Sequence, residues 1–189
     1  MIRATFYLAC IVLLLSTLVK ELDACKCAVD HPQNLVCNSQ FALVGRITKR
    51  TEATSAASSV SYTATVLVGI KGHVGKIGSN FTFETPSDGA ACGISPSIGS
   101  VQLLMGRITN GKHIIISCDL ILGTLTFEQM LYLLIPGSNA YKNNCTCKVN
   151  STVGCIVPKD KSSCYSDKAV CRRTSPKSRS CQWVNNETC

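Results

Sequence analysis

The chain has 189 residues, a formal net charge of +8, 46% hydrophobic residues and thirteen cysteines. This length is enough for one good hydrophobic core and a smaller appendage that needs covalent cross-links. Positive charge can indicate nucleic-acid binding, but only 6% of the residues are aromatic, which argues against a protein that stacks on bases. The sequence has no H-E-x-x-H motif and no nucleophile elbow, which argues against an enzyme.

Residues 1–24 have the features of a signal peptide. Arg3 gives a short basic region, residues 6–19 form an apolar or small-residue run, and Ala24 is a small residue at the expected cleavage position. The run is short for a membrane span, which needs about 20 residues. An uncleaved signal anchor is the alternative. We expect a chain that is secreted to the extracellular space or matrix and has no membrane span.

Removal of this leader, which contains Cys10, leaves twelve cysteines. An even and dense set in an exported chain predicts disulfides and not reduced thiols. A zinc cluster is the alternative, but the pairs Cys25/Cys27 and Cys145/Cys147 lack the C-x-x-C or H-x-x-x-H partners typical of such clusters. Cleavage would also make Cys25 the first residue, so that its free amine and its carbonyl could together bind a zinc ion.

Five short segments have strand patterns, and glycine-containing breaks separate them. Alternation of apolar and polar residues is clearest over residues 62–70, although Leu67 interrupts it. The other expected strands cover residues 41–49, 80–84, 101–108 and 113–117. Such a set favours a small closed or partly closed barrel. Helical spacing of Leu and Met over residues 125–134, with Thr126 as N-cap, predicts one helix after the strands.

The last part of the chain differs in composition, and we expect a second domain that begins near Cys145. It has few large apolar residues, so disulfides must supply much of its stability. Residues 145–189 contain eight Lys or Arg and three Asp or Glu, a net charge of +5. A basic extracellular surface suggests binding of sulfated glycans or acidic proteins, and a merely solvated face is the alternative.

Several cysteines stand in an ordered array with their neighbours. The motifs are Cys25-x-Cys27, His31-Pro32-Gln33, Cys37-Asn38-Ser39, Ala91-Cys92-Gly93, His113-Ile114, Ser117-Cys118-Asp119 and Cys145-x-Cys147. This array resembles the tissue inhibitors of metalloproteinases (TIMPs), and a looser match continues through residues 180–183. The resemblance implies a mainly β fold. It consists of a netrin-like module with an OB-type five-stranded barrel and a flanking helix over residues 25–145, then a small disulfide-rich, basic domain over residues 146–189.

The resemblance also implies the disulfides Cys25–Cys92, Cys27–Cys118 and Cys37–Cys145. The second domain departs from the family spacing because Cys189 follows the Cys181-x-Trp183 feature that usually comes last. Anchoring on that feature gives Cys147–Cys181, Cys164–Cys171 and Cys155–Cys189. Pairing in simple order gives Cys147–Cys189, Cys155–Cys164 and Cys171–Cys181. The sequence leaves both sets open.

The function implied by the resemblance is inhibition of secreted or cell-surface zinc metalloproteinases. Cys25 would bind the catalytic zinc of the target through its amine and carbonyl and displace the zinc-bound water. The protein would need no cofactor of its own and would act as a monomer in 1:1 complexes. The expected protease-binding residues are Cys25, Lys26, Cys27, Ala28 and Val29, together with Asp88, Gly89, Ala90, Ala91, Cys92 and Gly93 in an adjoining loop. The family usually has Thr or Ser where this chain has Lys26.

Another function remains open. A non-inhibitory netrin-like module could bind matrix glycans or a receptor through the basic C-terminal region. We expect no nucleic-acid partner, because export and the few aromatic residues argue against one. His31 is expected to be a loop residue and not a catalytic base. Four N-x-S/T sequons, at Asn80, Asn144, Asn150 and Asn186, are candidates for N-glycosylation.

Overall fold

The computed structural model describes residues 25–28, 30–52, 59–121, 129, 145–150, 154–175, 178, 180–184 and 189. The expected signal peptide, Val29, Asn144 and Asn186 lie outside these residues. Of the helix expected over residues 125–134, only Gln129 is described, and it is helical. Within the described part of the chain, no helix is both long enough and apolar enough to cross a bilayer.

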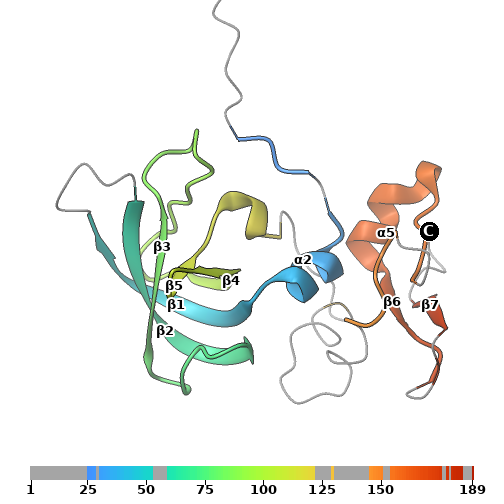
Figure 1. Ribbon diagram of the computed structural model, residues 1–189, viewed down its shortest axis with the longest axis horizontal. Coiled ribbons are helices and arrows are strands. Elements are labelled where there is room, and N and C mark those ends of the chain that lie inside the picture. Colours follow the sequence, from blue (N-terminus) through green and yellow to red (C-terminus); the bar gives the residue numbers. More distant parts are fainter. Residues whose placement is uncertain are drawn as a thin grey trace, which may run out of the picture.

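Five strands form a closed barrel (Figure 1), which confirms the expected mainly β class. The strands are β1 (Phe41–Thr51), β2 (Ser59–Lys71), β3 (Asn80–Pro86), β4 (Val101–Thr109) and β5 (Lys112–Ile114). Around the barrel they follow the order β1-β2-β3-β5-β4. Neighbouring strands are antiparallel except β3 and β5, which are parallel where Glu84 pairs with Ile114.

The last strand is shorter than the expected span of residues 113–117. Ile115 still donates its N–H to the carbonyl of Glu84, at 3.0 Å, and its side chain is buried. The chain then leaves the sheet, because the carboxylate of Asp119 accepts the N–H of Ile116 at 3.1 Å and begins the 3₁₀ turn η1 (Ser117–Asp119). Cys118 therefore lies on a turn and not on a strand.

Alternating side chains of the strands fill the barrel, as period-two patterning requires. Phe41, Tyr62, Phe81 and Phe83 are each at most 4% exposed. The rings of Phe41 and Phe81 lie 5.3 Å apart between centroids, and those of Tyr62 and Phe83 stack at 5.5 Å. Such aromatic pairs stabilise a core beyond the area that they bury. The barrel is therefore a firm base for the loops at its ends.

Helix α2 (Pro32–Asn38) lies between the barrel and the C-terminal elements (Figure 1). Val36 of α2 packs with Ala42 and Met105 on the outer side of the barrel. The C-terminal elements are η2 (Lys159–Lys161), α5 (Ser162–Lys168), β6 (Val170–Arg173) and β7 (Cys181–Val184), of which β6 and β7 form a two-stranded antiparallel sheet. Their core consists mainly of cysteines, with Val149, Val157 and Trp183 packed among them.

Six disulfides join the described cysteines. Cys25–Cys92, Cys27–Cys118 and Cys37–Cys145 agree with the pairing that the resemblance implies. The C-terminal pairs are Cys147–Cys181, Cys155–Cys171 and Cys164–Cys189.

Neither of the two expected sets of C-terminal disulfides is therefore correct as a whole. Of the set anchored on Cys181-x-Trp183, only Cys147–Cys181 is correct, and none of the pairs in simple order is. The physical reason is that Cys171, on β6, is buried beside Cys155 in the core cluster. Cys164 lies on α5, outside that cluster, and bonds Cys189 instead.

Candidate functional site

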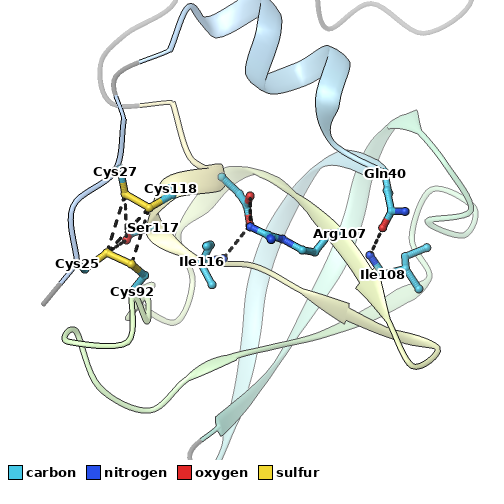
Figure 2. Close-up of polar contacts among 10 residues, drawn as sticks. Cys25, Cys27, Gln40, Cys92, Arg107, Ile108, Ile116, Ser117 and Cys118 are labelled. Atoms are coloured by element: carbon cyan, nitrogen blue, oxygen red, sulfur yellow. Dashed lines mark hydrogen bonds and ion pairs between the residues drawn. A yellow bond between two sulfur atoms is a disulfide. The ribbon is translucent and has the colours of Figure 1, made fainter.

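The N-terminal segment, defined here as residues 25–28, lies beside η1 and the loop that carries Cys92 (Figure 2). Cys25 and Cys27 are half-buried and alternate with the exposed Lys26 and Ala28. Both cysteines are bonded to the barrel. The disulfides thus hold the segment at residues 25 and 27, whereas the side chains of Lys26 and Ala28 face solvent.

The two disulfides lie side by side (Figure 2). The sulfur of Cys25 is 3.9 Å from that of Cys27 and 4.0 Å from that of Cys118, and the hydroxyl oxygen of Ser117 lies 3.3 Å from it. By distance alone, the four sulfurs resemble a metal-binding group, since all lie within 4.8 Å of one another. Each is bonded to another sulfur, however, and metals bind the thiolate. This cluster is a covalent clamp on the segment.

A hydrogen-bonded turn supports the clamp. Ser117 donates its N–H to the carbonyl of Cys92 at 2.8 Å, which joins the two loops that carry the clamp. Asp119 accepts the N–H of Ile116 and also pairs with Arg107 at 3.3 Å. The Arg107 side chain is 54% exposed, so this ion pair adds little stability. Its effect is to keep the Asp119 carboxylate oriented toward the turn.

The loop over residues 86–93, called here the clamp loop, is fixed by its own hydrogen bonds. The carboxylate of Asp88 accepts the N–H of Ala91 at 2.7 Å, and the carbonyl of Asp88 accepts the N–H of Gly93 at 2.9 Å. Cys92 has a φ of 63°, in the left-handed region that residues other than glycine rarely adopt. The loop therefore holds Cys92 in an uncommon conformation that presents its sulfur to Cys25.

Gly93 ends the clamp loop where a side chain has no room. A Cβ at this position would lie 2.2 Å from the carbonyl oxygen of Pro86 and 2.6 Å from that of Asp88. We expect Gly93→Ala to lower the free energy of unfolding by about 1–3 kcal/mol, as overpacking does elsewhere. Urea unfolding with the disulfides intact measures this change. Gly89→Ala is the matched control, because a Cβ there meets nothing within 4 Å; equal losses in the two variants would contradict the expectation.

Immediately after the segment, residues 31–34 form a joint with the C-terminal elements. Gln33 is fully buried, and its amide donates to the carbonyl of Cys171 at 2.8 Å and accepts the N–H of Cys171 at 3.0 Å. It also donates to the carbonyl of Cys147 at 2.9 Å. The side chain thus pairs with the backbone of β6 much as a neighbouring strand would. A buried amide with its bonds satisfied in this way specifies one relative arrangement of the two parts.

His31 is the second buried polar residue of the joint, at 4% exposed. Its Nδ1 accepts the N–H of Gln33 at 3.2 Å, so Nε2 carries the proton and donates to the carbonyl of Tyr165 at 3.1 Å. Burial lowers the pKa of His31 below 6.5, despite the opposing effects of the Tyr165 carbonyl and Asp30. As expected, the residue lies in a loop, and there it caps the N-terminus of α2.

A fall in pH should destabilise this joint through protonation of His31. The unfolded chain protonates His31 as the pH falls below about 6.5, whereas the folded protein keeps it neutral to lower pH. The contribution of His31 is therefore fully present above pH ~6.5 and is lost at up to about 1.4 kcal/mol per pH unit as the pH falls toward the folded pKa. His31→Asn keeps an acceptor for the helix cap and removes this titration. We expect urea unfolding to show a smaller loss of stability in the variant between pH 7 and pH 5, and identical losses would contradict the assignment.

The C-terminal elements also approach the N-terminal segment. A cavity of about 130 Å³ is lined by Cys27 and Ala28 on one side and by Ser166 and Asp167 of α5 on another. Asp167 is exposed. A partner that covers the segment would therefore also come close to α5.

The structure brings the two expected stretches together. Residues 25–28 and 88–93 adjoin through the Cys25–Cys92 bond, whereas Val29 is not described. The sequence patterns gave no separate role to Ser117 or Asp119, which support the clamp, or to Thr85, whose buried hydroxyl accepts the N–H of Ile94 at 3.0 Å. An Asp two residues after Ser117 is a recognisable capping signal and could have indicated the turn.

Comparisons with known proteins give a consistent result. The sequence model of a family described as tissue inhibitor of metalloproteinase matches residues 23–188. Metalloproteinase inhibitor 3 of Xenopus laevis is 27% identical over 148 residues, which are 77% of this chain and 67% of that protein. Metalloproteinase inhibitor 2 of Homo sapiens is 30% identical over 157 residues, 77% of this chain and 68% of that protein. The corresponding protein of Canis lupus familiaris is 31% identical over 149 residues, 72% and 64% of the two chains.

Proposed function

Because this chain belongs to the tissue inhibitor of metalloproteinase family, whose members are inhibitors and not enzymes, we propose that it acts on zinc metalloproteinases through Cys25. Export would remove residues 1–24 and leave Cys25 with a free amine. The amine and the carbonyl of Cys25 then bind the catalytic zinc of the target. The inhibitor needs no metal of its own, and a monomer forms a 1:1 complex with a secreted or cell-surface protease.

The chemistry follows from how catalytic zinc is held. Three protein ligands leave one position for water, and Cys25 takes that position. The amine must be neutral to donate its lone pair; an ordinary α-amino group has a pKa of about 7.7–8.0, and zinc favours loss of the proton. The sulfur of Cys25 is in a disulfide, so it is not the ligand. Without its water the protease cannot hydrolyse a peptide bond.

One observation carries this proposal: the clamp holds the N-terminal segment at both Cys25 and Cys27. A free chain end is usually poorly ordered, and ordering it on binding would reduce the affinity. Here the disulfides and the Ser117 turn order the segment before any protease arrives. Lys26 and Ala28 are exposed, as residues that enter a protease cleft must be. The clamp loop lies next to Cys25 and would fill the adjoining part of the cleft.

The test is an inhibition assay with correctly processed protein. N-terminal sequencing first establishes that the secreted chain begins at Cys25. Titration against catalytic domains of several zinc metalloproteinases then gives the inhibition constant and the stoichiometry. We expect tight inhibition of at least one target at one inhibitor per protease. Processed protein that inhibits none of a broad panel would refute the proposal.

A second function has some structural support. Lys148, Lys159, Lys161 and Lys168 are all exposed on or near the C-terminal elements, as binding of sulfated glycans would require. The exposed Asp160 and Asp167 lie among them, which weakens the local positive field. Retention on heparin that disappears when these four lysines are changed to Gln, with inhibition unchanged, would establish glycan binding as a separate activity.

A further inference from the structure

The sequon Asn80-Phe81-Thr82 begins strand β3. Phe81 is 4% exposed and points into the barrel core, whereas Asn80 and Thr82 are exposed. Because side chains alternate along a strand, Asn80 and Thr82 lie together on the outer face. The side-chain amide of Asn80 makes no hydrogen bond within the described part of the chain. A group attached to that amide would therefore displace nothing that the fold uses.

The surrounding face has room for a large polar group. Across the β2–β3 pair, Thr65 lies opposite Asn80 and Thr63 lies opposite Thr82. Both threonines are half-buried and small. The cross-strand neighbours of Asn80 and Thr82 on this face are thus short polar side chains.

The position of Asn80 along β3 separates it from the site. Strand β3 runs from Asn80 to Pro86, and at about 3.3 Å per residue these ends are about 20 Å apart. Pro86 begins the clamp loop, next to the N-terminal segment, whereas Asn80 adjoins the turn that follows β2. In Figure 1 this turn and the N-terminal segment lie at opposite ends of the barrel. A protease bound at the segment would leave Asn80 exposed.

We propose that Asn80 is an N-glycosylation site whose oligosaccharide lies on the end of the barrel remote from the inhibitory segment. The acceptor is Nδ2 of Asn80, and the donor is an oligosaccharide linked to a lipid pyrophosphate in the export pathway. A bond forms between Nδ2 and C1 of the first sugar as the bond between C1 and the pyrophosphate oxygen breaks. The lipid pyrophosphate leaves, and one amide proton is lost to a base. Modification rests on the proposed export of the chain and not on its inhibitory mechanism.

The other sequons are less well supported. Asn150 is exposed, but its side-chain oxygen accepts the N–H of Val157 at 3.0 Å, and residues 151 and 152 of its sequon lie outside the described residues. Asn144 and Asn186 are themselves outside them. Asn80 is thus the sequon in which the acceptor, the middle residue and the hydroxyl residue are all placed by the structure.

The first experiment maps modification at position 80. The full chain and the variants Asn80→Gln, Thr82→Val and Thr82→Ser are expressed in eukaryotic cells, and peptides are analysed by mass spectrometry before and after enzymatic release of N-glycans. We expect a glycan at Asn80 in the parent and in Thr82→Ser, which keeps the hydroxyl, and none in the other two. An unmodified Asn80 in the parent, whether in the medium or in the cells, would overturn the proposal. So would a glycan at Asn80 in Thr82→Val.

The second experiment tests the location. Asp88→Asn combined with Ala90→Thr creates a sequon on the clamp loop, while the new amide oxygen can still accept the N–H of Ala91. We expect loss of the Asn80 glycan to change the inhibition constant less than about 2-fold, and a clamp-loop glycan to weaken inhibition more than about 100-fold. Enzymatic release returns an aspartate to position 88 and should restore inhibition. A tenfold gain in potency from Asn80→Gln would place this end of the barrel at the interface and overturn the location. If the glycan is present but no form inhibits any protease, only the proposed function fails.

Discussion

Adding one alanine ahead of Cys25 should abolish inhibition while leaving the fold unchanged. The added residue converts the free amine of Cys25 into an amide, whose nitrogen has no lone pair available for zinc. It also places extra atoms where the zinc must lie. We expect the inhibition constant to rise by at least about 1,000-fold, equivalent to ~4 kcal/mol. The measurement is a titration against a metalloproteinase that the processed protein inhibits, with the N-terminus of every sample confirmed by mass.

The matched control carries the same alanine after Cys189. Cys189 is bonded to Cys164 on α5, so this variant tests whether extending a disulfide-bonded end is harmful in itself. Unchanged unfolding curves for both variants would exclude misfolding as the cause. If the N-terminally extended protein kept its full potency, zinc binding by Cys25 would be wrong. Glycan or receptor binding by the C-terminal region would then be the better hypothesis.

The barrel could be predicted from the sequence because its strands are half-buried. Residues such as Tyr62 and Ala64 point inward and alternate with threonines that point outward, so the pattern appears directly in the chain. β5 was less predictable, because its end depends on the Asp119 carboxylate and not on apolar periodicity. The C-terminal pairing was not predictable from spacing, since six cysteines allow fifteen connectivities, and only the packing of the C-terminal core brings Cys171 to Cys155.

Only part of the candidate site could be predicted from the sequence, because some of its contacts join residues that are far apart in the chain. Cys25 and Cys27 could be identified because they directly follow the expected signal peptide, and the resemblance to the TIMP family implied their disulfide partners. In the sequence, nothing distinguishes Gln33 from a glutamine on the protein surface. Its hydrogen-bond partner Cys171, on β6, is 138 residues away, so no local pattern links the two. Long-range pairing of a polar side chain with backbone leaves no local signature. The joint was therefore visible only in the structure.

The clamp and the joint together explain how the N-terminal segment can be rigid beside the chain end that the proposed cleavage would create. The clamp fixes residues 25 and 27 from the barrel side, and the joint fixes residues 31–34 against β6 and α5. The N-terminal segment is thus held within its own length by the clamp and beyond its C-terminal end by the joint. Disulfides alone would leave the stretch after Cys27 free to pivot, whereas buried hydrogen bonds at Gln33 restrict that pivot.

Replacing Lys26 by Thr should tighten inhibition of a typical matrix metalloproteinase. In the proposed complex Lys26 is the second residue of the processed chain, and the resemblance to the TIMP family implies that its side chain enters an apolar pocket of the protease. Burying an ammonium group without a matching charge is costly, unless its stem reaches along the pocket and places the charge at the mouth. We expect Lys26→Thr to lower the inhibition constant by about 10- to 100-fold, equivalent to ~1.4 to ~2.8 kcal/mol. Parallel titrations of both proteins against the same catalytic domain measure the difference.

A second variant separates charge from size. Lys26→Met keeps a long unbranched side chain and removes only the ammonium group. If charge is the obstacle, both Lys26→Thr and Lys26→Met should tighten inhibition; if length is the obstacle, only Lys26→Thr should. A protease with an acidic residue at the pocket mouth should show the reverse order and prefer Lys26, because the ammonium group then gains a partner. An inhibition constant that is the same for all three proteins on every target would show that residue 26 does not enter the pocket, and the placement of the N-terminal segment in the cleft would have to be abandoned.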